Sequence, residues 1–256
     1  MPDDGKSGLR RCTLTTLTIH DPWKHLRADC FGNQEPEVVL EAVTAPLEVL
    51  ESKHDPDQLW SSIETMPAWS AAMSYGSREK LAGATEKQVS LNRKLIQLGH
   101  HTPLESIQFN FHVSGISKAC GAQLSRHRVG QGHVSSSRRF QSQGMSFVYP
   151  LLPYIKDEAE ARSALKVISD MNRMAFEVYE KLREDSRLHK EDARRVIPVA
   201  SSQERVWWVN ARALRDFFRL RLPKDAEWEI RRLAIMVYNI VSKIAPSIFE
   251  DVVTEG

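Results

Sequence analysis

The feature that most constrains this chain is an uneven distribution of charge. From Ser106 to Lys156, over 51 residues, there is no Asp or Glu, although the 256-residue chain carries 33 acids and a formal net charge of +2. Within this window, segment 123–140 (QLSRHRVGQGHVSSSRRF) holds four arginines, two histidines, two glycines and three consecutive serines. Clustered positive charge attracts anions, and arginine binds phosphate or carboxylate through paired planar donors. We therefore predict an anion-binding site in this segment.

The composition narrows the class of protein to which the chain can belong. Hydrophobic residues make up 41% and charged residues 27%, as in soluble globular domains. We find neither a membrane-length apolar run nor a secretory signal, so we expect no membrane partner. Three widely spaced cysteines argue against a disulfide framework and for a reducing compartment, so we expect a cytoplasmic protein. A net charge near zero does not predict a nucleic-acid partner.

Periodicity predicts one helix-rich α+β domain over residues 36–256, after a poorly ordered segment over residues 1–35 that contains a short strand at 12–19. Residues 67–75 should form a packed turn and residues 130–137 a loop. The expected strands cover residues 38–44, 47–50, 107–113 and 206–209. The expected helices cover residues 58–64, 85–98, 117–126, 157–185, 191–195, 210–220 and 226–244.

The longest expected helix, 157–185, has a core-facing stripe of apolar residues. The spacing of three and four residues keeps the stripe on one face. Its members are residues 161, 164, 165, 168, 171, 175, 178 and 182.

Other kinds of site find less support in the sequence. Adjacent His100 and His101 lack helical ligand spacing and no CxxC occurs, so we predict no metal site. Cys120 lies among small residues on a helix, where packing is the more frequent role. Ser136 could be activated by His127 or His133, but no acid is nearby to orient either ring. The basic segment itself is open to three interpretations: a solvated surface, a nucleic-acid contact, or a small-molecule phosphate site, which glycines and serines favour.

A second basic set lies in the last third of the chain. Two tryptophans, Trp207 and Trp208, and two phenylalanines accompany Arg212 and Arg221 there. Aromatic walls with cations at their edge suit a flat aromatic ligand that carries phosphates. The alternative is a set of core aromatics with ordinary surface arginines.

These residues together resemble the flavin-dependent thymidylate synthases. The family signature is Arg-His-Arg, seven residues, Ser, and then Arg two residues later, which matches Arg126-His127-Arg128, Ser136 and Arg138. Four further segments match the family and stand in the family's order along the chain: GHHTPLESIQFNFHV, RVIP, VNAR and AEWEI. The likeness covers about residues 66–250 and implies the family fold, a helix-rich α+β domain with a small antiparallel sheet.

The resemblance also implies roles for individual residues. Arg221 would be catalytic and would polarise the uracil ring. The uridylate would be bound by Gln123, Arg126, Ser136, Ser137, Arg138, Arg194 and Arg221. FAD would be bound by His100, Thr102, Arg126, His127, Arg128, Asn210, Arg212 and Asp216.

The implied reaction is reductive C5-methylation of a uridine monophosphate, with dUMP to dTMP favoured. Methylenetetrahydrofolate would supply the carbon, NADPH would reduce FAD, and the enzyme would be a homotetramer with active sites between subunits. Departures from the family pattern lie at Met73, Gln131, Val134, Arg139 and Asp216. They leave open the methylation of UMP or another pyrimidine nucleotide in a specialised pathway. The basic segment leaves open a second alternative, a non-enzymatic RNA- or phosphate-binding module.

Overall fold

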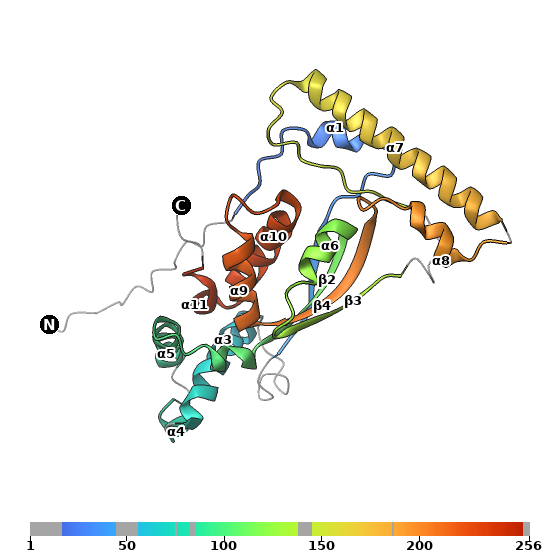
Figure 1. Cartoon of the computed structure of the whole chain (residues 1–256). Coiled ribbons are helices and arrows are strands. Elements are labelled where there is room, and N and C mark those ends of the chain that lie inside the picture. Colours follow the sequence, from blue (N-terminus) through green and yellow to red (C-terminus); the bar gives the residue numbers. More distant parts are fainter. Residues whose placement is uncertain are drawn as a thin grey trace.

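A four-stranded antiparallel sheet forms the centre of the protein (Figure 1). The computed structural model describes residues 17–44, 56–74, 76–81, 85–137, 145–185 and 187–252. Its strands are β1 (Glu37–Val43), β2 (Gln108–Ser117), β3 (Gln131–Ser135) and β4 (Ser202–Asn210), in the order β1-β2-β4-β3. The helix-rich α+β prediction is confirmed. The predicted strand at 47–50 and residues 12–16 lie outside the described residues, and no strand begins in Leu17–Ile19.

Strand β3 corrects the predicted loop at 130–137. It pairs along its length with β4, from Gln131 opposite Val209 to Ser135 opposite Arg205. The sequence hides this strand because Gly132 interrupts the usual pattern of bulky alternating residues. A Cβ on Gly132 would lie 2.6 Å from the ring of Trp208, so glycine lets the two strands pair beside that indole.

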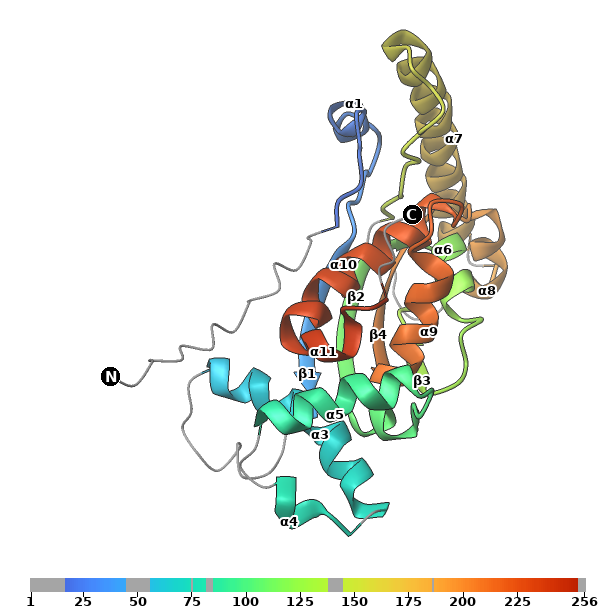
Figure 2. The ribbon, with the colours of Figure 1, turned by 90° about the vertical axis from the view of Figure 1, so that its left-hand side faces the viewer.

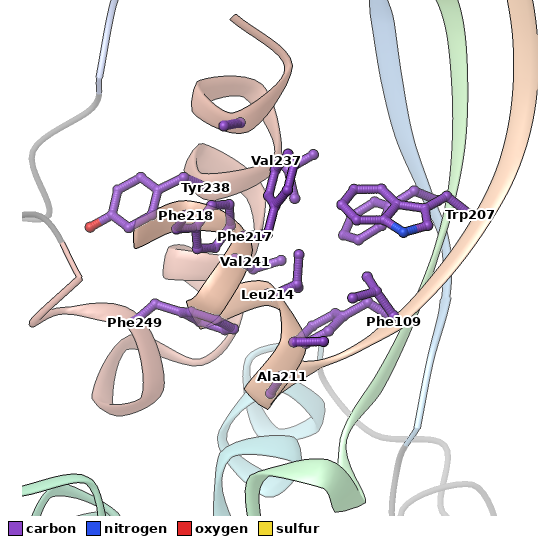
Figure 3. Close-up of a cluster of buried hydrophobic side chains, with 14 of the residues drawn as sticks. Phe109, Trp207, Ala211, Leu214, Phe217, Phe218, Val237, Tyr238, Val241 and Phe249 are labelled. Atoms are coloured by element: carbon purple, nitrogen blue, oxygen red, sulfur yellow. The ribbon is translucent and has the colours of Figure 1, made fainter. Parts of the chain in front are cut away.

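Helices cover one face of the sheet and form the main core with it. Figure 2 shows α9 (Ala211–Arg221), α10 (Trp228–Ile244) and α11 (Pro246–Phe249) lying over the same strands. Phe109 and Trp207 point from the sheet toward Phe217 and Phe249 of the helices (Figure 3). The opposite face of the sheet carries partly exposed apolar residues, which include Val39, Val134, Val206 and Trp208.

A helical layer packs at one end of the sheet. It contains α3 (Pro56–Ser74), α4 (Arg78–Leu81), α5 (Thr85–Gln97) and the short 3-10 helix η1 (Thr102–Ser106). The turn predicted at 67–75 is wrong, because residues up to Ser74 belong to α3. Ala68, Ala71 and Ala72 are buried on one helix face, and alanine's helix propensity together with this packing accommodates Pro67 inside the helix.

A second hydrophobic cluster lies at the other end of the sheet. It joins α1 (Lys24–Ala28), α7 (Glu158–Glu184), α8 (Lys190–Ala193) and the 3-10 helix η2 (Arg194–Val196). Trp23 and Leu26 are buried in it, and Arg27 is 1% exposed beside Asp21 and Glu35. These contacts join residues 21–35 to the second hydrophobic cluster and to its neighbouring acids.

Helix α7 differs from its prediction on one face. Ala161 and Leu165 are buried as expected, but Met171 is 59% exposed and Val178 is 38% exposed. With Val167 and Met174 they form an exposed stripe at spacings of four, three and four residues. The helix therefore has two apolar faces, of which the described residues cover one. None of the described helices has both the length and the apolar character that crossing a membrane requires.

Candidate functional site

The end of α9 and the loop after α6 (Lys118–Leu124) bring three predicted site residues together. Ser117 caps α6 by accepting a hydrogen bond from the Cys120 amide. The chain then turns so that His127 faces Arg221, the last residue of α9. Arg221 Nε donates to His127 Nε2 at 3.1 Å, and Arg221 Nη1 donates to Gln123 Oε1 at 3.5 Å. We call Gln123, His127 and Arg221 the Arg221 cluster.

The electrostatics of the cluster favour an uncharged imidazole beside a charged guanidinium. The pKa of His127 is lowered, first by burial and then by repulsion from Arg221. The His127 ring also packs edge-on against Phe217, with centroids 5.1 Å apart. Among the described residues, no carboxylate lies within ion-pair distance of Arg221. Its positive charge therefore remains available to a ligand.

A cavity of about 320 Å³ gathers three residues of the predicted uridylate site. Ser136, Ser137 and Arg194 line it. Ser136 extends the β3–β4 pairing, since its amide donates to the Glu204 carbonyl at 2.9 Å. Lys118, Ser135, Ser202 and Gln203 complete the lining. The cavity contains two cations and four serines, and no carboxylate. It is therefore suited to a phosphate. We call it the serine cavity.

Two further uridylate residues are not among those that line the described cavity. Arg126 is exposed in the turn after α6, and Arg138 lies outside the described residues. Lys118 was missed by sequence reasoning. Its only signal is its position directly after the Ser117 cap, at the start of a helix that leads into the basic segment.

The start of α9 brings together part of the predicted flavin set. Asn210 is buried and caps α9, with its Oδ1 accepting from the Ala213 amide at 2.8 Å. The backbone amide of Asn210 donates a hydrogen bond to the Gly130 carbonyl at 2.9 Å. This bond holds the basic loop against the start of the helix. Arg212 binds Glu105 of η1 through Nη1 at 2.6 Å, and Thr102 begins that same 3-10 helix.

The remaining residues of the predicted flavin set have exposed side chains. Arg128 and His100 are exposed, one just before β3 and the other just before η1. Asp216 lies on the exposed side of α9 and pairs with Arg219 at 3.6 Å, so the structure gives it a partner within its own helix.

The arrangement fits a dinucleotide flavin at the start of α9. Arg126 and Arg128 make no ion pair with a described residue, and a Cβ on Gly130 would lie 2.5 Å from the Asn210 side-chain amide. Glycine at φ +69° therefore lets the loop lie close to the helix start. Cations, a hydroxyl and a closely approaching backbone are the donors that bind a pyrophosphate.

Two positions that depart from the family pattern have clear structural surroundings. Gln131 Oε1 accepts a hydrogen bond from Trp207 Nε1 at 2.7 Å, so this side chain satisfies a buried indole. Val134 is 63% exposed and lies opposite Val206 on the partly exposed face of the sheet. Met73 is 65% exposed on α3, and Arg139 lies outside the described residues.

A buried arginine, also missed from the sequence, connects the turn after α6 with the serine cavity. Arg205 of β4 is 6% exposed and donates from Nη1 to Ser125 Oγ at 2.9 Å. Ser125 Oγ lies 3.2 Å from His133 Nε2, and the pKa of His133 is lowered by burial and then by Arg205. Arg205 Nη2 also reaches Gln203 of the serine cavity, at 3.5 Å. Cys120 nearby is fully buried and its thiol pKa is raised by burial, as expected for a packing residue.

Comparison with known proteins identifies the family of the chain. The sequence model of the family described as "Thymidylate synthase complementing protein" matches residues 58–247. The chain is 34% identical over 205 residues to the flavin-dependent thymidylate synthase of Geobacter sulfurreducens, covering 78% of this chain and 84% of the relative. It is 30% identical over 204 residues to the protein of that name from Clostridium tetani, covering 73% and 81%.

Proposed function

This chain belongs to the thymidylate synthase complementing protein family, and on that premise we propose that it is a flavin-dependent thymidylate synthase. The reaction is reductive methylation of C5 of a uridine monophosphate, with dUMP converted to dTMP. The observation that carries the proposal is the Arg221 cluster, in which a guanidinium without a carboxylate partner among the described residues is held by Gln123 and His127.

Arg221 acts on the pyrimidine ring. A guanidinium placed near N3 stabilises negative charge on the ring oxygens and nitrogen, which raises electron density at C5. His127 and Gln123 keep the guanidinium oriented, so the protein need not reorganise as charge develops. No activated cysteine is required, consistent with the buried and protonated Cys120.

The serine cavity binds the nucleotide phosphate. Ser136, Ser137 and Arg194 supply hydroxyl and guanidinium donors, and we add Lys118 to them on the basis of its place in the cavity lining. Arg138 follows these serines in sequence and joins the same group in this proposal.

FAD binds at the start of α9, where Thr102, Asn210, Arg212 and the Arg126–Arg128 loop provide its donors. When bound, the flavin supplies the hydride that completes the new methyl group. NADPH is the proposed reductant and methylenetetrahydrofolate the carbon donor. His100, exposed before η1, is expected to contact flavin and folate.

The enzyme is proposed to act as a homotetramer with active sites between subunits. In a single chain, the Arg221 cluster and the serine cavity have no residue in common. The exposed stripe on α7, formed by Val167, Met171, Met174 and Val178, supports self-association because its spacing is that of a helix–helix seam. A cytoplasmic location is supported by the free thiols of Cys30 and Cys120.

The nucleotide preference can be measured directly. Purified protein is incubated with FAD, NADPH, methylenetetrahydrofolate and either dUMP or UMP, and the methylated product is quantified. We expect dTMP from dUMP. Product from UMP alone would instead support the specialised alternative, and a colourless protein with steeply salt-dependent RNA affinity would support an RNA-binding module.

A further inference from the structure

Glu227 makes a contact that reaches into the Arg221 cluster from outside it. It stands before α10 as the N-cap residue, and its Oε2 accepts hydrogen bonds from the Glu229 and Ile230 amides, each at 3.2 Å. The same oxygen accepts a third hydrogen bond, from Gln123 Nε2 at 3.2 Å. One carboxylate oxygen therefore joins the start of α10 to the end of α6.

The donor and acceptor properties of Glu227, Gln123 and Arg221 fix the direction of the hydrogen bonds between them. A carboxylate only accepts hydrogen bonds and a guanidinium only donates them. Gln123 lies between Glu227 and Arg221, so only one amide orientation satisfies both: its NH₂ faces Glu227 and its oxygen faces Arg221. The opposite orientation would turn the amide NH₂ toward the guanidinium and the amide oxygen toward the carboxylate.

The same reasoning continues to the imidazole. Arg221 Nε donates to His127 Nε2, so that ring nitrogen carries no proton. With Nε and Nη1 engaged, Nη2 is the guanidinium nitrogen that makes no hydrogen bond to a described residue. Both of its N–H donors, with the second N–H of Nη1, are left for a ligand.

We infer that Glu227 is a positioning residue for the nucleotide ring, which acts by fixing the Gln123 amide so that Gln123 and His127 together hold Arg221 in a single orientation. This inference rests on the proposed function of Arg221. Glu227 itself touches neither substrate nor cofactor. Its effect is transmitted through Gln123.

The surroundings of Glu227 allow it to be changed without emptying the core. Its side chain is exposed and contributes to the lining of a wide groove of about 960 Å³, with Trp23, Tyr154 and Trp228 among the other lining residues. A shorter side chain there is replaced by water. The capping role can also be kept separately, because serine is a good N-cap residue but does not reach Gln123.

The test compares Glu227→Ser, which keeps the helix cap, with Glu227→Gln, which keeps the length and an acceptor oxygen. Gln123→Ala and the double variant Gln123→Ala/Glu227→Ser complete a double-mutant cycle. We measure melting temperature, flavin content, binding of dUMP by calorimetry, and kcat and KM for dUMP.

We expect Glu227→Ser to lose about tenfold in kcat/KM while retaining fold and flavin, and Glu227→Gln to stay within about threefold of the wild type. The double variant should be no worse than Gln123→Ala. Wild-type-like activity of Glu227→Ser, or additive losses in the cycle, would overturn the inference. A wild-type enzyme that binds dUMP but forms no dTMP would count against the proposed function instead, and dUMP binding would still test Glu227.

Discussion

Arg221 donates a hydrogen bond to His127 at 3.1 Å, and this joins the last residue of α9 to the basic loop after α6. The two residues are far apart in the sequence and belong to different predicted ligand sets, one for the nucleotide and one for the flavin. Under the proposed assignments, their contact makes one hydrogen-bonded unit serve both ligands. Changes on either side should therefore affect catalysis more than folding.

Replacing Arg221 with alanine should abolish turnover and leave flavin bound. Loss of a preorganised charge donor at a reacting ring costs about 10² to 10³ in kcat. The measurements are dTMP formation and the flavin absorption spectrum. Arg219→Ala is the matched control, since Arg219 lies on the same helix but is 65% exposed and pairs with Asp216. Activity of Arg221→Ala close to that of the control would show that Arg221 does not polarise the ring.

Replacing Arg194 with alanine should weaken nucleotide binding with a smaller effect on kcat. A charge-assisted hydrogen bond to phosphate contributes roughly 1.5–3 kcal/mol, so KM for dUMP should rise by about ten- to a hundredfold. Lys118→Ala should act in the same direction. Arg195→Ala is the control because Arg195 is 81% exposed and lies 3.7 Å from Asp192. Equal KM values for Arg194→Ala and Arg195→Ala would remove Arg194 from the phosphate site.

Replacing Glu229 with glutamine should flatten the pH dependence of stability. Burial raises the pKa of Glu229 from 4.5 to about 7, against the opposing effect of hydrogen bonds from Ser117. Because the folded pKa is the higher one, its stabilising contribution is complete below pH 4.5 and is lost as pH rises through 7. By this linkage the wild type should lose up to roughly 3 kcal/mol relative to Glu229→Gln by pH 8.

Urea denaturation at pH 5 and pH 8 measures this difference. The lowered pKa values of His127 and His133 give the opposite slope, with stability rising as pH rises through 6.5, but they are common to both proteins and cancel. Exposed Glu177→Gln serves as the control. Parallel pH profiles for the wild type and Glu229→Gln would contradict the prediction.

Charges placed on the exposed stripe of α7 should dissociate the enzyme. Met171→Asp combined with Met174→Asp puts two carboxylates into an apolar helix seam, where an unpaired charge is strongly unfavourable. Sedimentation velocity should show smaller species, and dTMP formation should fall if sites form between subunits. Val199→Asp, at a residue that is 69% exposed and not part of α7, is the control. A double variant with unchanged mass would place the subunit interface elsewhere.

Much of the fold follows from local signals in the sequence. Helix α9 was predicted almost to the residue because Asn210 is a good cap and Pro223 ends the apolar pattern. Strand β3 could not be predicted, since Gly132 is explained only by the Trp208 ring opposite it. Met171 was assigned to the core because periodicity identifies an apolar face but not what covers it.

The residues of the candidate site also divide into those found from the sequence and those found only from the fold. The resemblance supplied Ser136, Ser137 and Arg194, and the structure adds that they line one cavity. Lys118 and Arg205 were missed because each has ordinary neighbours in the sequence. Their importance comes from strand pairing and helix packing, which bring together residues far apart along the chain.

The length of strand β3 also sets the distance between two parts of the proposed site. The strand lies at the edge of the sheet, with the basic loop at one end and the serines of the cavity at the other, and its five residues span about 16 Å. Inserting one residue would turn every later side chain to the other face of the sheet. Insertions and deletions within β3 should therefore be far more damaging than substitutions there, and its length should limit which nucleotides the enzyme accepts.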